Sequence, residues 1–417
     1  MIKRSHILQL SVYILLLLLF SCKSTERLRN INFNTKYNPG AKTIHPEIKI
    51  YHHDNEYSTL YFRINSDELS YIRSSVDDHF KANFSLKYRV LPSYNSTELI
   101  DSASVNFVDS LNFESGNYIS DSIIIYAPKG NDYKLHLVIR DHNKRTESPV
   151  LDNIYKSNDY SVQNFKIFDQ DNSMLFYPYI EEASTIRLEY KYPESFTMNG
   201  LIFQQSLGLA KPPFLKSDET TELSSDATTA VKFESGIATV SIKEKGHYYF
   251  FNNNDTLQGF SLYFFHEGYP FIKTHESMLM PIKYLVSSAD FEKLKANSDT
   301  RGAIDRFWVK MAGNPERARR LVSRYYKNVE NSNIFFTSYK DGWKTDRGMI
   351  YTVFGPPDIV IISDEGETWH YEDSWQMMDL QFDFIQQEHK FTNNHYILIR
   401  KPAHRNPWYN GVENWRK

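Results

Sequence analysis

The sequence predicts a mainly β protein with an α+β domain at its C-terminal end. From about Ile44 to His275, apolar and polar residues alternate with a period of two, which is typical of strands with one buried face. After Pro281 the apolar period becomes that of a helix, and strands return only beyond Asp358. We therefore expect two immunoglobulin-like antiparallel β-sandwiches in series, followed by a helical segment and a small antiparallel sheet.

The N-terminal residues have the features of a secretion signal. Lys3 and Arg4 provide a positive start, and the apolar run from Ile14 to Phe20 is shorter than the roughly 20 residues of a membrane-spanning helix. Residues 1–21 therefore indicate a lipoprotein signal peptide. An uncleaved signal anchor is the alternative, and the short run makes it the weaker interpretation.

Cys22 is the only cysteine of the chain and directly follows the apolar run. Leu19-Phe20-Ser21-Cys22 resembles a lipobox, the segment in which a cysteine receives lipid. We therefore expect a lipid such as palmitate on Cys22, attachment to a membrane and no disulfide bond. Residues 22–43 are polar and contain Pro39-Gly40, so we expect a flexible tether between the lipid and the first domain.

Charge and composition limit the classes of partner. The chain has 48 Lys and Arg side chains and 51 Asp and Glu side chains, a formal net charge of −3, which gives no reason to expect nucleic-acid binding. Its 417 residues are enough for more than one domain. The 29 Tyr and 28 Phe residues favour a β-dominated fold.

Alternating segments separated by turn residues define the two predicted sandwiches. The first is predicted over residues 44–150, where a clear alternating set is Phe84, Leu86, Tyr88 and Val90. The second is predicted over residues 151–280, where the corresponding set is Ile186, Leu188, Tyr190 and Tyr192. The two segments show no sequence repeat close enough to prove duplication.

The third predicted domain covers residues 281–417. One apolar helix face is formed by Ile304, Phe307, Trp308 and Met311. Asn314 is placed to cap the next helix, and Pro315 suits its first position. The expected strands are Val360 to Ile362, Thr368 to Tyr371, Leu380 to Phe384 and Tyr396 to Arg400.

The densest motif of the chain connects these helices and strands. Its residues are Gly342, Trp343, Thr345, Asp346, Arg347, Gly348, Gly355, Pro356, Pro357 and Asp358. The first two glycines permit close backbone approach, and Thr345 and Asp346 suit a helix N-terminus. Gly355 suits a left-handed helix end, after which two prolines prevent continuation. If Asp346 only caps, Asn replaces it with little loss, because Asn accepts the same hydrogen bond.

This motif resembles the signature of the GWxTD-domain family of Gram-negative bacterial lipoproteins. The resemblance covers about residues 281–400, and Phe307-Trp308 and Arg324-Tyr325-Tyr326 also lie where motifs of that family lie. It implies an outer-membrane lipoprotein, and it implies no activity.

The candidates for catalysis or metal binding are weak. His52-His53-Asp54 offers ligand-type side chains, but adjacent residues of a strand point to opposite faces, so we expect no metal site. A catalytic triad could be formed by Asp346, Arg347 and His370, but the sequence places no activated nucleophile with them. No Walker, dinucleotide, HExxH or GxSxG pattern occurs. We therefore expect no cofactor and no catalysis.

Two further sets of side chains have a structural and a functional interpretation. A basic helix face, which is either solvated or a surface for lipid headgroups or an acidic partner, comprises Arg317, Arg320, Arg324 and Lys327. Aromatic residues, which we expect in the core of the third domain rather than in a ligand site, are Phe335, Phe336, Trp343, Trp369 and Trp375.

The functional expectation rests on this architecture. We expect a lipoprotein anchored through Cys22 in the outer membrane, facing the periplasm, that binds or scaffolds another protein of the cell envelope. No pattern indicates a small-molecule ligand. The alternative is an envelope enzyme or a carbohydrate-binding protein that uses a cleft beside Trp343 and Asp346. A convergent pocket with carboxylates or a histidine in the third domain favours this alternative, and a flat surface opposes it.

Overall fold

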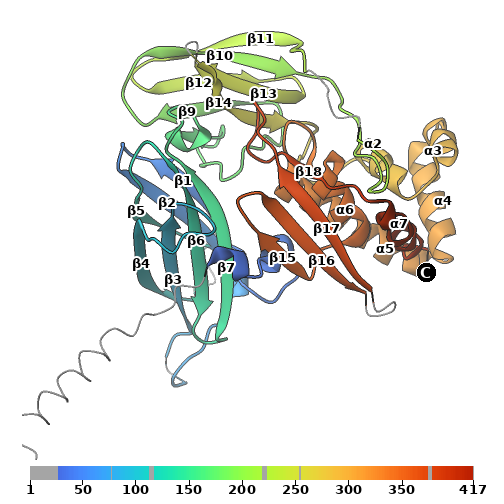
Figure 1. The fold of residues 1–417 in the computed structure, drawn as a ribbon, viewed down its shortest axis with the longest axis horizontal. Coiled ribbons are helices and arrows are strands. Elements are labelled where there is room, and N and C mark those ends of the chain that lie inside the picture. The colour runs from blue at the N-terminus through green and yellow to red at the C-terminus, as the bar shows by residue number, and fades with distance from the viewer. Residues whose placement is uncertain are drawn as a thin grey trace, which may run out of the picture.

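The computed structural model describes residues 27–76, 78–111, 117–217, 223–252, 255–373 and 378–416. The predicted signal peptide, Cys22 and Trp375 lie outside these residues. Within them, no helix is both long and apolar enough to cross a membrane. Two β-sandwiches and a C-terminal domain of helices and strands surround a common centre (Figure 1).

The first sandwich consists of two antiparallel sheets with the strand orders β1-β2-β5 and β4-β3-β6-β7. This is the immunoglobulin-like arrangement that the sequence predicts. Alternate residues such as Phe84, Leu86 and Tyr88 fill the core between the sheets. The strands are β1 (Glu47–His52), β2 (Tyr57–Asn65), β3 (Lys81–Leu91), β4 (Asp101–Ser110), β5 (Tyr118–Tyr126), β6 (Asp132–Asp141) and β7 (Thr146–Tyr155).

The second sandwich repeats this topology, with the strand orders β12-β9-β8 and β11-β10-β13-β14. Strands β8 to β14 of the second sandwich occupy, in the same order, the positions that β1 to β7 occupy in the first. The strands are β8 (Phe165–Phe168), β9 (Ser184–Tyr190), β10 (Phe196–Phe203), β11 (Ala227–Phe233), β12 (Ile237–Ile242), β13 (Gly246–Asn252) and β14 (Asp255–Phe264). The repeat is therefore visible in topology although the sequence shows none.

β7 continues to Tyr155, so the predicted boundary at residue 150 falls inside this strand.

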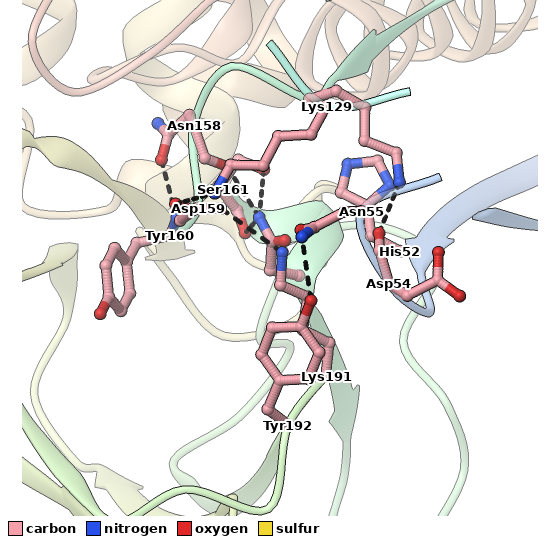
Figure 2. Close-up of polar contacts among 12 residues, drawn as sticks. His52, Asp54, Asn55, Lys129, Asn158, Asp159, Tyr160, Ser161, Lys191 and Tyr192 are labelled. Atoms are coloured by element: carbon pink, nitrogen blue, oxygen red, sulfur yellow. Dashed lines mark hydrogen bonds and ion pairs between the residues drawn. The ribbon is translucent and has the colours of Figure 1, made fainter. Parts of the chain in front are cut away.

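Charged residues connect the two sandwiches. In the linker that follows β7, the Asp159 carboxylate pairs with Lys129 Nζ at 2.7 Å and with Lys191 Nζ at 3.5 Å (Figure 2). Lys129 belongs to the first sandwich and Lys191 follows β9 of the second. One carboxylate therefore joins both units.

The C-terminal domain combines helices with an antiparallel sheet of order β15-β16-β17-β18. Asn314 caps the longest helix as predicted, because its Oδ1 accepts a hydrogen bond from the Arg317 N–H at 2.9 Å. The helices are α2 (His275–Leu279), α3 (Ser288–Lys295), α4 (Thr300–Ala312), α5 (Pro315–Phe336), α6 (Asp346–Phe354) and α7 (Arg405–Glu413). The strands are β15 (Ile359–Ile362), β16 (Gly366–Asp373), β17 (Met378–Gln386) and β18 (Tyr396–Leu398).

The N-terminal segment packs on this C-terminal domain. Leu28, Phe33 and Tyr37 are at most 1% exposed and belong to its core cluster. The Phe33 N–H donates to the Val360 carbonyl at 2.9 Å, and the Tyr351 hydroxyl donates to the Tyr37 carbonyl at 2.7 Å. The prediction of a flexible tether over residues 22–43 is therefore wrong for residues 28–37. The apolar and aromatic side chains of this otherwise polar segment, which supply the burial that holds it, are Leu28, Ile31, Phe33 and Tyr37.

The long connection between β10 and β11 also reaches the C-terminal domain. The Ala210 N–H donates to the Lys344 carbonyl at 3.0 Å, and Arg400 Nη2 donates to the Lys211 carbonyl at 3.1 Å. Tyr179, between β8 and β9 of the second sandwich, makes another contact with the C-terminal domain. Its hydroxyl donates to the Ile334 carbonyl of α5 at 2.7 Å. All three units are thus joined to one another by hydrogen bonds or buried contacts.

Candidate functional site

The signature motif folds into a short 3₁₀ turn (η6, Gly342–Lys344) followed by α6. Thr345 caps α6 as predicted: its Oγ1 accepts from the Gly348 N–H at 3.0 Å and donates to the Gly342 carbonyl at 2.7 Å. Gly355 ends the helix with φ 84° and ψ −163°. This is a positive φ, but not the left-handed helical conformation that the sequence suggested.

Gly342 and Gly348 allow η6 to lie against α5 and α6 without side-chain atoms between the backbones. A Cβ on Gly342 would lie 2.0 Å from the Ser332 carbonyl oxygen. A Cβ on Gly348 would lie 1.9 Å from the Gly342 carbonyl oxygen. Real Cβ atoms do not approach this closely, so both positions require glycine.

Trp343 is a core residue, 3% exposed. Its ring meets Tyr284 edge-on at a centroid distance of 5.9 Å, and its carbonyl accepts from the Tyr284 hydroxyl at 3.2 Å. Trp369 is fully buried in the same cluster. These rings therefore hold the domain together and are not surfaces for a ligand.

Asp346 is buried and paired rather than a capping residue. Its Oδ1 accepts from Arg400 Nη2 at 2.6 Å, and its Oδ2 accepts from Arg400 Nη1 at 2.8 Å. Oδ2 also accepts from the Leu398 N–H at 2.8 Å, on the edge of β18. The bidentate pair fixes α6 to the end of the sheet. Sequence patterns did not indicate Arg400 as the partner of Asp346, because the two residues are 54 positions apart.

Arg347 forms a second buried pair, with Glu367 on β16. Arg347 Nη1 donates to Glu367 Oε1 at 3.0 Å, and the side chains are 3% and 1% exposed. Glu367 also accepts from the Tyr37 hydroxyl at 2.8 Å and from Trp369 Nε1 at 2.9 Å. Burial alone would lower the pKa of Arg347, but Glu367 and the nearby tyrosines raise it. Arg347 therefore stays charged, and Glu367 has donors on both oxygens. Arg347 also donates to Asn394 Oδ1.

The imagined trio of Asp346, Arg347 and His370 does not assemble as a unit. Glu367 and Trp369 are buried on the core face of β16, whereas His370, the residue after Trp369, lies on the opposite face because side chains alternate along a strand. Asp346 and Arg347 are instead paired with Arg400 and Glu367.

The turn after α6 ends in Asp358, which is exposed. Pro357 is buried and Pro356 is half-buried. Asp358 Oδ2 accepts from the Glu372 N–H at 2.7 Å, and its carbonyl accepts from Asn34 Nδ2 at 2.8 Å. These contacts start β15 and hold the N-terminal segment.

His52 and His53 point to different surroundings. His52 is 1% exposed, and its ring nitrogens contact Ser58 Oγ at 2.8 Å and the Tyr155 carbonyl at 3.0 Å. His53 is exposed. Burial lowers the pKa of His52 to about 3, and the neighbouring Lys156 acts in the same direction. Across the described ranges, no three His, Cys, Asp or Glu side chains are placed to hold a metal ion.

A chamber of about 780 Å³ lies where the three units meet. Its lining includes Asp152 and Tyr155 of β7, Tyr179, β14 residues, and Glu367, His389 and Tyr396 of the C-terminal domain. Lys36 of the N-terminal segment also lines it. The chamber is thus assembled from parts of the chain up to 360 positions apart, and sequence patterns did not indicate it. Arg347 and Glu367 form part of its wall.

The chamber contains two charged groups whose contacts are incomplete. Lys36 Nζ lies 5.4 Å from the Tyr37 ring centroid, and within the described residues it has no hydrogen-bond or ion-pair acceptor. Burial lowers the pKa of Lys36, which the nearby Glu367 opposes. Asp152 accepts one hydrogen bond, from the Asn153 N–H at 2.8 Å. Burial raises the pKa of Asp152, although Asn153 and Lys36 oppose this.

Comparison with known proteins adds a domain assignment. No curated protein matches the chain. Among solved structures, red sea bream transglutaminase aligns at 8% identity with a TM-score of 0.18, covering 49% of this chain and 28% of that enzyme. At these values the alignment supports no conclusion about function.

The family comparison finds the GWxTD domain over residues 246–417. The match begins in β13 of the second sandwich, well before the Pro281 start that the motif resemblance suggested, and it extends to the last residue. The closing strands β13 and β14, the helices and the final sheet thus fall within one family unit. Residues 246–417 of this chain are thus similar to the GWxTD domain.

Proposed function

We propose that the protein is a non-catalytic binding component of the cell envelope, attached to the outer membrane by a lipid on Cys22 and facing the periplasm. The observation that carries the proposal is the chamber of about 780 Å³ between the three units. Concave sites with a few convergent polar groups are the usual place for a bound partner. The expected lipid anchor rests on the lipobox-like sequence before Cys22.

The contacts of the signature support binding over catalysis. The carboxylates of Asp346 and Glu367 are ion-paired and accept further hydrogen bonds, and Asp358 Oδ2 accepts from the Glu372 N–H. Thr345 is occupied as a helix cap. A general base must reach a substrate proton, and these groups already hold donors.

The alternative of an enzyme or a carbohydrate-binding protein is supported in part, because the chamber brings Glu367 and His389 of the C-terminal domain together, but this cavity does not lie beside Trp343 and Asp346. These residues are 3% and 2% exposed, and neither lines the chamber. A carbohydrate-binding role finds its better location in the chamber itself, where tyrosines and polar groups converge.

Membrane attachment and partner binding are tested together on the full chain. Detergent-solubilised envelopes are passed over an affinity-tagged protein, and co-purifying proteins and glycans are identified by mass spectrometry. We expect a specific partner with the parent protein, and we expect Cys22→Ser to leave the membrane fraction, because one lipid chain contributes about 0.8 kcal/mol per buried CH₂. Retention of Cys22→Ser in salt-washed membranes would contradict the anchor, and the absence of any specific partner would contradict the binding role.

A further inference from the structure

The chamber wall is rich in aromatic side chains that are neither fully buried nor fully exposed. Half-buried aromatic residues line it from all three units, and they are Tyr155, Tyr179, Phe335, Phe391 and Tyr396. Aromatic rings in a core are normally covered completely, as Trp343 and Trp369 are here. Neighbours already cover part of these rings, since Arg347 lies 3.6 Å from the Tyr396 ring centroid and Tyr177 stacks on Tyr179 at 5.7 Å. The surface that stays accessible can contact an apolar face of a ligand.

Strand edges border the chamber, and several of their backbone groups already have hydrogen-bond partners. On β7, Gln163 accepts from the Tyr155 N–H at 2.8 Å and donates to the Asn153 carbonyl at 2.7 Å. On β14, Tyr263 exchanges hydrogen bonds of 2.9 Å with Pro178 and Ile180.

The edge of β18 is occupied as well, because the Leu398 N–H donates to Asp346 at 2.8 Å. A peptide that binds by adding a strand needs free edge groups. The capped edges therefore favour a ligand that is recognised by side chains.

The polar groups of the chamber carry both signs of charge. Within the described residues, Lys36 has donors without an acceptor, and one carboxylate oxygen of Asp152 has no hydrogen-bond donor. The exposed Glu388 and Lys390 add one charge of each sign at the lining. This balance does not favour a polyanion such as nucleic acid. It suits a ligand with many hydroxyl groups, which both donate and accept hydrogen bonds.

We propose that the chamber binds an oligosaccharide, whose pyranose faces lie on the half-buried aromatic rings and whose hydroxyl groups bond to Lys36 and Asp152. This inference rests on the proposed binding function and names its ligand class. Tyr155 on β7 and Tyr396 on β18 both line the chamber. Neutral and acidic sugars both present pyranose faces and hydroxyl groups. Only an acidic sugar carries a carboxylate that can pair with the Lys36 ammonium group.

Calorimetric titration of the detergent-solubilised full chain tests the proposal. The probes are the β-1,4-linked tetramer of N-acetylglucosamine, the tetramer of galacturonic acid, and tetra-alanine as the peptide control. We expect binding of at least one sugar and none of the peptide. Lys36→Met and Asp152→Asn should each weaken sugar binding by about ten-fold or more, the usual effect of losing a hydrogen bond to a charged group. Lys36→Met should affect the acid sugar more than the neutral one.

Tyr155→Leu should weaken binding of either sugar. Tyr118→Leu, at a β5 position that is 53% exposed and does not line the chamber, should not. Circular dichroism checks that each variant is folded. If Tyr155→Leu does not fold, Tyr396→Leu takes its place as the variant of the chamber lining. Binding of the peptide alone, binding of neither sugar, or equal effects of Tyr155→Leu and Tyr118→Leu would overturn the inference. If sugars fail but a protein partner co-purifies, the ligand class is wrong and the binding function stands.

Discussion

Asp346 shows how one residue of the signature acts through partners that are distant in sequence. In a buried site, its carboxylate accepts hydrogen bonds from Arg400 Nη1 and Nη2 and from the Leu398 N–H. Removing one member of a buried ion pair leaves the other charge without compensation. We therefore expect Asp346→Asn to lower the free energy of unfolding by about 3–5 kcal/mol, not by the small amount of a lost cap. Urea unfolding measures it.

The double variant Asp346→Asn with Arg400→Met is the control, because it removes both charges. It should be more stable than Asp346→Asn alone. A single variant that unfolds at the parent's urea midpoint would show that the pair does not stabilise the fold.

His247 gives a pH-dependent prediction at the same scale. It is 1% exposed, its Nε2 contacts Ser261 Oγ at 2.7 Å, and its Nδ1 has no hydrogen-bond partner among the residues that the structure describes. Burial lowers its pKa from 6.5 to about 3. The stability it contributes is fully present above pH 6.5 and is lost as pH falls towards 3.

The variant His247→Phe keeps the stacking on Phe203 and cannot bind a proton. Between pH 6.5 and 3, we expect its unfolding free energy to fall less steeply than the parent's, by up to about 1.4 kcal/mol per pH unit. Thermal unfolding across this range measures the slope. His142→Phe, at an exposed position, is the matched control and should keep the parent's slope. Identical slopes for all three proteins would refute the prediction.

At the scale of elements, residues 28–37 act as part of the C-terminal domain. Phe33 is fully buried and its backbone extends the edge of β15. We expect Phe33→Ala to lower the unfolding free energy by about 3–5 kcal/mol, the usual cost of deleting a buried aromatic ring. Lys42→Ala, at an exposed position just after this segment, should stay within about 0.5 kcal/mol of the parent. Equal stability of both variants would mean that the segment is a free tether.

At the scale of the molecule, Asp159 joins the sandwiches through two lysines of different burial. The Lys191 side chain is 4% exposed and Lys129 is 44% exposed. Asp159→Asn leaves a buried ammonium without its charged partner, so we expect a loss of about 1–3 kcal/mol. Lys129→Met removes only the exposed pair and should cost less than about 1 kcal/mol. Equal losses, measured by thermal unfolding, would show that the buried lysine does not depend on Asp159.

Local patterns predicted much of the fold because their causes lie within a few residues. The period of two in β3 and the caps on α5 and α6 depend on neighbours along the chain. The helix α7 was not predicted, because Pro407 and Gly411 interrupt its pattern. It forms because Trp408 is buried and Gly411 lies close to the ring of Phe354. Tertiary packing thus overrides local propensity there.

The sequence by itself determined the order of strands and helices, the place of the signature and the local ends of α6. Only the tertiary structure decided what Asp346 and Arg347 contact, that Tyr37 belongs to the C-terminal core, and that a chamber lies between the units. Tyr37 and Glu367 are 330 positions apart. Capping and periodicity are local interactions that one stretch of sequence encodes, whereas ion-pair partners and cavities depend on how separate units are placed in space.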